Sequence, residues 1–226
     1  MKRLFILFLL VVCMGAQVLA QSHLYLQNPV TFIKDYPRID GVLDSQLTQL
    51  PRRQFDDDIL KSNEENHIHP VNYRLGYGTD FLYLYIEVEA NSVIIRENGY
   101  RNGDGFMLSL TVPQFDNKPT EEFYNMGFYP TGNDQKPAGK IIWQYNANYA
   151  SEILDEASEC QVNVVMDKVG FELLLPWKDV YPYHPWFSGE IGFNLFFVKA
   201  IPGNEKNIHG VLLDDRLNLD QNLLKL

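Results

Sequence analysis

Aromatic and planar polar side chains gather in two parts of the chain. Tyr100 and Arg101 stand in the loop-like sequence GYRNGDG, while Tyr124, Trp143 and Tyr145 fall in two strand-like segments that follow it. Flat rings can cover the axial C–H face of a pyranose, and planar polar groups bind its hydroxyls in pairs. These five residues therefore predict a sugar-binding surface. The competing interpretation is that Tyr and Trp occur here as strand formers that pack against their neighbours.

Two glutamates and two further tryptophans bear on that surface. Glu87 and Glu89 alternate along an aromatic strand and would accept hydrogen bonds from sugar hydroxyls. Trp186 lies in the sequence YPYHPWFSG, whose rings and prolines suit either an exposed contact surface or a cluster that covers the edge of a sheet. We include Trp186 among the sugar-binding candidates. Trp177 follows Pro176 at the end of a strand, where a large ring is expected to cap the core.

The sequence gives only weak evidence for a metal site. Calcium takes about six to eight oxygen ligands, and two acidic runs offer carboxylates, Asp56 to Asp58 and Asp214 with Asp215. No EF-hand loop surrounds them, so solvated surface charge is the preferred interpretation. His67 and His69 lack the further ligands that zinc requires. We expect no required cofactor, with structural calcium as the open alternative.

Catalytic motifs are absent from the sequence. Glycoside hydrolysis needs two carboxyl groups about 5 to 9 Å apart, one of them with a raised pKa, and no pair is marked among the acidic residues. There is no Gly-x-Ser-x-Gly turn, phosphate-binding loop or Cys–His nucleophile context. We therefore expect a protein that is not an enzyme. Cys160, at the start of a strand, is expected to be a small core residue.

The element that should position these residues is a hairpin from Val71 to Ala90, joined by a short Gly-containing connection at 78–80. In its second half, aliphatic residues alternate with aromatic and acidic ones, which is the period of a half-buried strand. The aliphatic face should pack in the core. The other face carries Phe81, Tyr83, Tyr85, Glu87 and Glu89, and we expect function to reside there.

The remaining segments predict short strands separated by turns. Alternation predicts strands over 106–112, 121–130, 140–146 and 191–200, a hairpin over 160–177 that turns at Asp167 to Gly170, and a last short strand after His209. One helical turn is predicted where Leu43, Leu47 and Leu50 recur, with Asp40 or Asp44 as the cap. The pattern predicts an all-β fold, an antiparallel, jelly-roll-like β-sandwich with one short N-terminal helical turn.

The N-terminus has the features of a secretory signal peptide. Lys2 and Arg3 precede a short apolar run, and Val18 and Ala20 suit cleavage after Ala20. We therefore divide the 226 residues into a leader, 1–20, and a single domain, 21–226. No other apolar run is long enough to span a bilayer. The expected location is secreted, periplasmic or at the cell surface.

The net charge of the chain limits the kinds of binding partner to be expected. The whole chain carries a formal charge of -10, and removal of two basic residues with the leader makes it -12. Such an acidic protein is not expected to bind nucleic acid or anionic lipid. The mature chain would keep Cys160 alone of the two cysteines, so it has no intrachain disulfide and must be stabilised by its core.

Several motifs, in order, carry a resemblance to a known family. They are RIDGVLD, YRLGYGTDFLYLYIEVEA, a GDG before a strand, VGFELLLPWKDV and IGFNLFFV. Together they resemble the carbohydrate-binding module family nine-like domains, which are DOMON-like β-sandwiches of secreted bacterial proteins. The resemblance covers nearly all of the mature chain. It implies a sugar-binding sandwich, often with structural calcium, that accompanies glycan-degrading enzymes.

The chain departs from the family where the sugar is held. Family members grip a sugar between two Trp rings, one in the loop before the Asp-Ser strand and one near the C-terminus. Here that loop offers Tyr100 and Arg101, and the C-terminal stretch has no Trp. Met107 replaces a polar residue, and Lys199 and Ala200 replace an Asn-Asp pair. The resemblance therefore implies the fold more directly than it implies the sugar clamp.

Three hypotheses follow. The first is a secreted, non-catalytic carbohydrate-binding module that recognises a glycan or oligosaccharide in support of polysaccharide breakdown, beside a glycoside hydrolase or a surface protein. The second is a structural or protein-contact module at the cell surface that has lost the sugar clamp. The third is a haem-binding sandwich of the DOMON type, for which the available ligands are Met107, Met126, His184 and His209.

Overall fold

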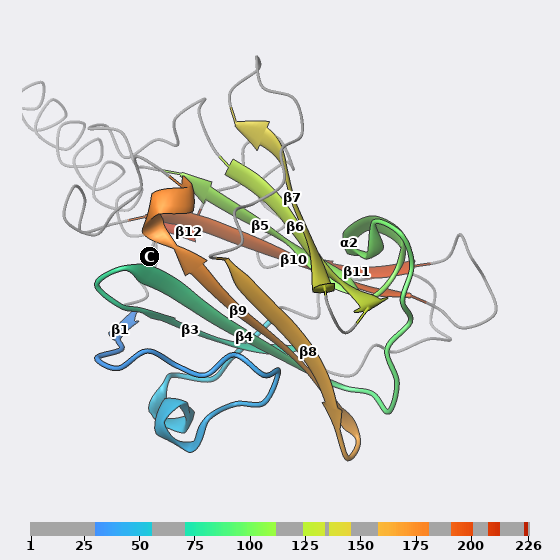
Figure 1. Cartoon of the computed structure of the whole chain (residues 1–226), viewed down its shortest axis with the longest axis horizontal. Coiled ribbons are helices and arrows are strands. Elements are labelled where there is room, and N and C mark those ends of the chain that lie inside the picture. Colours follow the sequence, from blue (N-terminus) through green and yellow to red (C-terminus); the bar gives the residue numbers. More distant parts are fainter. Residues whose placement is uncertain are drawn as a thin grey trace, which may run out of the picture.

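Two β-sheets packed face to face make up the part of the chain that the structure describes (Figure 1). The structure is a computed structural model, and it describes residues 30–55, 71–111, 124–133, 136–145, 158–180, 191–200, 208–212 and 224–225. Helical segments there are limited to η1 (Ser45–Gln49), α2 (Gly99–Asn102) and η3 (Trp177–Val180). The prediction of an all-β sandwich is confirmed.

Sheet A is built around the predicted hairpin. Its strand order is β1-β3-β4-β9-β8, with β2 also paired to β3. The hairpin is β3 with β4, in antiparallel register with Tyr77 opposite Leu82. Only the short pairing of β1 with β3 is parallel among the described strands of this sheet. The strands are β1 (Thr31–Phe32), β2 (Arg53–Gln54), β3 (Asn72–Tyr77), β4 (Phe81–Glu89), β8 (Glu159–Val165) and β9 (Lys168–Pro176).

Sheet B lies opposite and is antiparallel in its described pairings. Its order is β11-β10-β5-β6-β7, with β12 also paired to β10. The strands are β5 (Gly105–Thr111), β6 (Tyr124–Asn133), β7 (Lys136–Tyr145), β10 (Gly192–Ala200), β11 (Ile208–Leu212) and β12 (Leu224–Lys225). β5, β6, β7, β10 and β11 overlap the strands predicted from alternation, with β6 and β7 extending to Asn133 and back to Lys136, whereas no strand is predicted at β12.

The main core fills the space between the two sheets. Sheet A contributes Leu84 and Phe171, and sheet B contributes Phe106, Phe128 and Phe197, each at most 1% exposed. The ring of Phe171 meets those of Phe106 and Phe197 edge to face, with centroids 6.2 and 5.4 Å apart. Burial of this apolar surface is the main favourable term in folding.

Two predictions about core residues are confirmed. Trp177 is 4% exposed, and its indole Nε1 donates a hydrogen bond of 3.1 Å to the carbonyl oxygen of Gly78. The ring therefore caps the core and closes on the connection between β3 and β4. Cys160 is also buried, and burial raises the pKa of its thiol to about 12, so it stays protonated at neutral pH.

Most of the outer face of sheet A is covered, and the prediction of a functional face on the hairpin is wrong for its aromatic residues. Phe81, Tyr83 and Tyr85 are at most 7% exposed and form a second cluster with Leu47 and Leu50. The N-terminal segment supplies this cover. Its predicted helical turn is the 3-10 helix η1, where Asp44 is the N-cap residue but makes no side-chain capping bond. These leucines pack on the sheet rather than at one end of the core.

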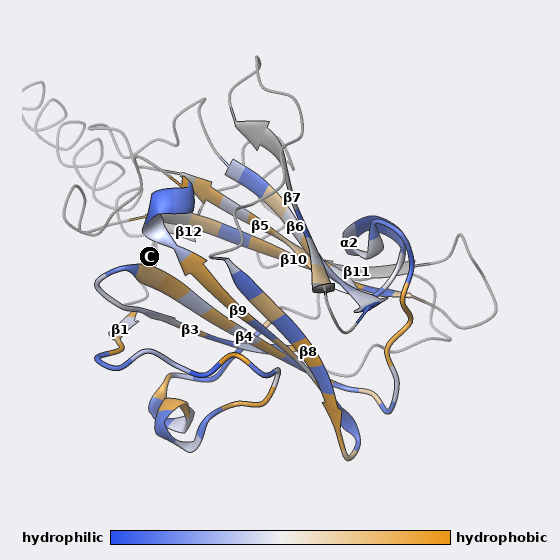
Figure 2. Cartoon of the chain, in the orientation of Figure 1, coloured by the Kyte–Doolittle hydropathy of each residue, from blue (hydrophilic) through white to orange (hydrophobic). Residues whose placement is uncertain are grey.

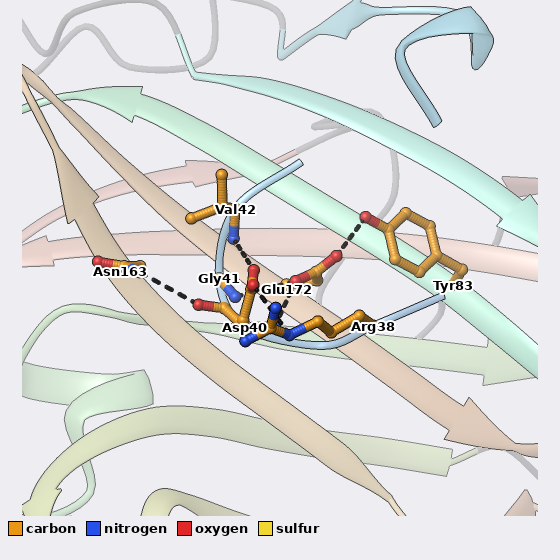
Figure 3. Close-up of polar contacts among 7 residues, drawn as sticks. All are labelled: Arg38, Asp40, Gly41, Val42, Tyr83, Asn163 and Glu172. Atoms are coloured by element: carbon orange, nitrogen blue, oxygen red, sulfur yellow. Dashed lines mark hydrogen bonds and ion pairs between the residues drawn. The ribbon is translucent and has the colours of Figure 1, made fainter. Parts of the chain in front are cut away.

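A buried carboxylate attaches the Asp-Gly turn of the N-terminal segment to sheet A (Figure 3). Glu172 Oε2 accepts hydrogen bonds of 2.9 Å from both the Asp40 and the Gly41 backbone N–H. Its Oε1 accepts a bond of 2.7 Å from the Tyr83 hydroxyl. Gly41 has φ +80, and a Cβ there would lie 2.6 Å from the backbone nitrogen of Asn163, so only glycine fits this close approach.

The hairpin of β8 and β9 turns earlier than predicted. Val165 pairs with Lys168, so the turn residues are Met166 and Asp167 rather than the stretch from Asp167 to Gly170. Along β8, at one end of the sheet order, hydrophilic and hydrophobic residues alternate, whereas β9 is mostly hydrophobic (Figure 2). Both faces of β9 are buried in the two clusters, which explains its continuous apolar run.

Candidate functional site

The loop from Asn91 to Asp104 places one-turn helix α2 against sheet B (Figure 1). This segment, called the 91–104 loop below, leads from the end of β4 to the start of β5. Asn98, just before α2, has φ 55, and Arg101 N donates a 2.9 Å hydrogen bond to the Asn98 carbonyl. The left-handed conformation suits Asn better than most residues. The loop therefore holds Tyr100 and Arg101 in a defined place.

Tyr100 lies on the face of sheet B that points away from the core, but its ring is not exposed. The ring rests on Gly127, where a Cβ would come within 2.5 Å of it. Its centroid is 5.7 Å from that of Tyr129, and only 3% of the residue is accessible. The expectation of an exposed Tyr100 ring is therefore wrong, because the absence of a side chain at Gly127 lets the ring sink onto the sheet.

Arg101 is the exposed member of this cluster. Its guanidinium carbon lies 5.2 Å from the Tyr100 ring centroid, within range of a cation–π contact. Tyr129 is half-buried, and burial raises the pKa of its hydroxyl, which stays protonated and able to donate. Tyr100 thus supports the Arg101 side chain, while Arg101 and Tyr129 present donors at the surface.

A row of polar residues crosses sheet B beside this cluster. Asn194 of β10 pairs with Ser109 of β5, Ser109 with Asn125 of β6, and Asn125 with Gln144 of β7. With strands about 4.8 Å apart, the row extends for about 14 Å. Ser109 is half-buried and donates a hydrogen bond to Asn125 Oδ1, while Asn125 and Asn194 are buried.

Sequence reasoning missed this row. Ser109 and Asn194 each interrupt an apolar strand, and each alternates with core residues, which is the signal that places both on the face away from the core. Their alignment across strands depends on register, which a single sequence does not contain. Hydroxyl and amide groups in such a row both donate and accept hydrogen bonds, as a sugar hydroxyl requires.

The other predicted rings are not brought together with Tyr100. Tyr124 is 8% exposed and belongs to the core cluster, so the expectation that it offers a ring to a ligand is wrong. In β7 the register shifts at Trp143, because Ile142 pairs with Met126 and Gln144 with Asn125. The backbone thus has an extra residue at Trp143, and Tyr145 pairs with Tyr124. The side chains of Trp143 and Tyr145, and the whole of Trp186, lie outside the described residues.

Glu87 and Glu89 lie on sheet A and so do not join the rings of sheet B. They line a groove of about 1160 Å³ between the N-terminal segment and the tip of the β8–β9 hairpin. Glu87 is paired with Lys168 at 3.0 Å and with Arg52 at 3.4 Å. The structure therefore divides the predicted composite site between two sheets.

Glu172 has the raised pKa expected of a catalytic acid, yet its position is structural. Burial raises its pKa, opposed by hydrogen bonds from Tyr83, Asp40 and Gly41. With 0% of the residue exposed, the carboxyl cannot reach a bound substrate. It is better explained as the anchor of the N-terminal turn.

The described residues bear on only part of the haem and metal ligand sets considered from the sequence. Met126 lies in the core and Met107, its neighbour across a shared strand pair, alternates to the other face of sheet B, so the two cannot ligate one iron. Within the described ranges no group of three or more His, Cys, Asp or Glu side chains could hold a metal ion. The acidic runs proposed for calcium, the His67 and His69 pair, and His184 all lie outside those ranges.

No helix in the described part of the chain is both long and apolar enough to cross a membrane.

Comparison with known proteins shows the fold. No protein-family model and no curated protein sequence matches the chain. Among solved structures, a carbohydrate-binding module family 9 domain from Caldicellulosiruptor kristjanssonii in complex with cellotriose is 14% identical, with TM-score 0.58, over 86% of this chain and 89% of that one. The same type of module from that organism in complex with glucose is 15% identical, with TM-score 0.58, over 86% and 94%.

A third similar structure is a proposed carbohydrate-binding protein from Bacteroides uniformis ATCC 8492. It is 11% identical, with TM-score 0.54, over 81% of this chain and 87% of that one. The agreement extends over most of each chain. The protein described here has the β-sandwich fold of carbohydrate-binding module family 9.

Proposed function

We propose that this protein is a secreted, non-catalytic carbohydrate-binding module that holds a glycan or oligosaccharide on the face of sheet B away from the core. The observation that carries the proposal is the polar row of Asn194, Ser109, Asn125 and Gln144, bordered by Arg101. A hydroxyl-rich ligand laid across the strands would meet the half-buried Ser109 and the exposed Arg101, while Asn125 and Asn194 are buried and form the polar base of the row. The fold supports the proposal, since similar structures hold cellotriose and glucose.

The ring contacts in this proposal come from β7 and the loop after β9. Trp143 stands at the register shift beside the polar row, and β-bulges often redirect a side chain at a binding site. Trp186 completes the set that we propose, with Tyr129 at the opposite end of the surface. Tyr145 is left out of the set, because it pairs with the core residue Tyr124 and so belongs to the other face of sheet B. Tyr100 and Tyr124 serve as supports behind it.

We also propose that residues 1–20 are removed as a leader and that 21–226 act as a single domain outside the cytoplasm. There the module would assist a glycoside hydrolase or a surface protein in polysaccharide breakdown. No cofactor is needed for the contacts described. Structural calcium, if bound, would use the acidic runs at 56–58 and 214–215.

Titration of intrinsic Trp fluorescence tests the proposal. Residues 21–226 are titrated with glucose, cellotriose and a panel of other mono- and oligosaccharides, each with and without calcium, and calorimetry follows any sugar that leaves fluorescence unchanged. A saturable response to one sugar class supports the module. If no sugar binds to protein that unfolds cooperatively, the proposal is wrong, and the structural or protein-contact alternative becomes the better explanation.

Arg101→Ala separates a ligand contact from a packing contact. Loss of a hydrogen-bonded charged group should weaken sugar binding by about 1.5 to 3 kcal/mol, while stability changes little because the side chain is exposed. Arg52→Ala is the matched control, since it removes an exposed Arg that pairs with Glu87 on sheet A. Equal binding by both variants and the wild type would exclude Arg101 from the site.

A further inference from the structure

A buried carboxylate closes the base of the 91–104 loop. Asp104 is 1% exposed, and its Oδ2 accepts a 2.9 Å hydrogen bond from the Ile94 backbone N–H. In return, Asp104 N donates a 3.0 Å bond to the Ile94 carbonyl oxygen. The beginning and the end of the loop are thereby joined through one residue.

The same carboxylate ties the loop to strand β10. Asp104 Oδ1 accepts a 2.8 Å hydrogen bond from the Ala200 backbone N–H, and Oδ2 forms an ion pair with Lys199 Nζ. Lys199 Nζ also donates a 3.1 Å bond to the Ser92 carbonyl oxygen. The Lys199 side chain is only 18% exposed, so the ammonium contacts both ends of the loop from a partly desolvated position.

We infer that Lys199 is a positioning residue of the proposed sugar site, holding the 91–104 loop on sheet B and so fixing where Arg101 stands. This inference rests on the proposed function for its effect on binding. The physical reason is the cost of a buried charge, because Asp104 without the ammonium would be an uncompensated carboxylate. The loop base would open to water rather than keep that charge buried.

Other contacts within the loop explain why the position of its tip, residues 96–103, depends on its base, where Asp104 bonds to Ile94. Arg96 Nη1 donates a 2.6 Å hydrogen bond to the Asn102 carbonyl oxygen, and Gly103 N donates a 2.8 Å hydrogen bond to the Gly99 carbonyl oxygen. The tip is thus an internally bonded unit. It is carried on the two segments that Asp104 and Lys199 join, so movement at the base displaces Arg101 relative to the polar row.

Limited trypsin digestion tests the anchor without any sugar. Arg96 and Arg101 are cleavage sites within the loop, and mass spectrometry of the products reports cleavage there. In Lys199→Met we expect cleavage after Arg96 or Arg101 to be at least about tenfold faster than in the wild type, because cleavage follows the population of the open loop. Lys199→Arg, which keeps the charge, should restore the wild-type rate.

Lys168→Met is the matched control for the digestion. It removes an ammonium that pairs with Glu87 on sheet A, away from the loop, and should leave cleavage at Arg96 and Arg101 unchanged. If Lys199→Met is cleaved in the loop no faster than this control, the inference is wrong. Should Lys199→Met fail to fold, hydrogen exchange of the wild type decides the question. The Ile94 and Ala200 amides are expected to exchange as slowly as strand amides, and exchange at the rate of open loops would overturn the anchor.

Sugar titration then tests the positioning role. For a sugar that the wild type binds, Lys199→Met should bind at least about fivefold more weakly, with Lys199→Arg close to the wild type. Unchanged binding by Lys199→Met, together with faster loop cleavage, would refute the positioning role. If the wild type binds no sugar, the proposed function fails, and the digestion still decides whether Lys199 anchors the loop.

Discussion

At the level of single residues, burial decides which of the predicted binding side chains can contact a ligand and which only pack against other protein groups. Tyr100 and Tyr124 have the side chains of sugar platforms, yet at 3% and 8% exposure they pack against other protein groups. Arg101 remains exposed because it lies above the Tyr100 ring. A residue type suitable for ligand contact therefore becomes a ligand contact only where the fold leaves it accessible.

Glu172 offers a prediction at this scale. In Glu172→Gln, the amide oxygen can accept from the Asp40 and Gly41 N–H groups, and the amide nitrogen can donate to the Tyr83 hydroxyl. We expect a loss of less than about 1 kcal/mol in the free energy of unfolding. Glu172→Ala leaves those three donors without this acceptor and should cost about 3 kcal/mol or more, measured by urea denaturation.

The pH dependence of these variants has a definite sign. Burial raises the pKa of Glu172 above its usual value of 4.5, so the folded state binds this proton more tightly than the unfolded state. Its contribution to stability is complete below 4.5 and is lost as the pH rises through the raised, folded-state pKa. The stability of the wild type relative to Glu172→Gln should therefore fall across that window. If the free energies of unfolding of the wild type and Glu172→Gln change in parallel from pH 4 to 8, the carboxyl has the same pKa in the folded and unfolded states.

At the scale of elements, hairpins and loops decide which faces of the sheets remain open. The 33–50 segment covers much of the outer face of sheet A, and a groove remains beside Glu87 and Glu89. On sheet B, α2 covers the part next to Gly127. The polar row beside it is the feature that distinguishes this face.

The β8–β9 turn provides a prediction at the element scale. Met166 is 90% exposed with φ 57, a conformation that costs residues other than glycine about 1 to 2 kcal/mol. Met166→Gly should relieve that cost. Because Gly also has more conformational entropy in the unfolded chain, part of the benefit is offset, and we expect the free energy of unfolding to rise by about 0.5 to 1 kcal/mol. Val165→Gly, at the end of strand β8, should instead destabilise. A loss of stability in both variants, measured by thermal unfolding, would mean that the Met166 side chain makes a stabilising contact.

At the scale of the whole molecule, the two sheets share one core. The main cluster combines residues of both sheets, among them Leu84 and Phe171 from sheet A and Phe106 and Leu195 from sheet B. Neither sheet can bury its inner face without the other. This shared core explains how the same sandwich occurs in structures of only 11% to 15% identity, since a pattern of apolar faces is enough to specify it.

The shared core predicts cooperative unfolding of residues 21–226. Far-UV and near-UV circular dichroism should report one coincident urea transition, as expected of a two-state domain. Two separated transitions would show that the sheets unfold independently and would contradict the single-domain proposal.

The sequence by itself determined the fold class and most of the longer strands, because alternation with a period of two survives in any antiparallel sandwich. It also identified Trp177 and Cys160 as core residues. It did not determine the functional face. The outer face of the hairpin is as aromatic as a binding surface would be. The alternating pattern does not show whether that face contacts solvent or is covered by a segment distant in the sequence.

Only the tertiary structure decided which polar residues stand together. The row from Asn194 to Gln144 depends on the pairing and register of four strands, two of them, β5 and β10, more than 80 residues apart in the sequence. The contact of Lys199 with Asp104 spans 95 residues in the same way. Such contacts are set by long-range strand register, which the order of residues along one strand does not contain.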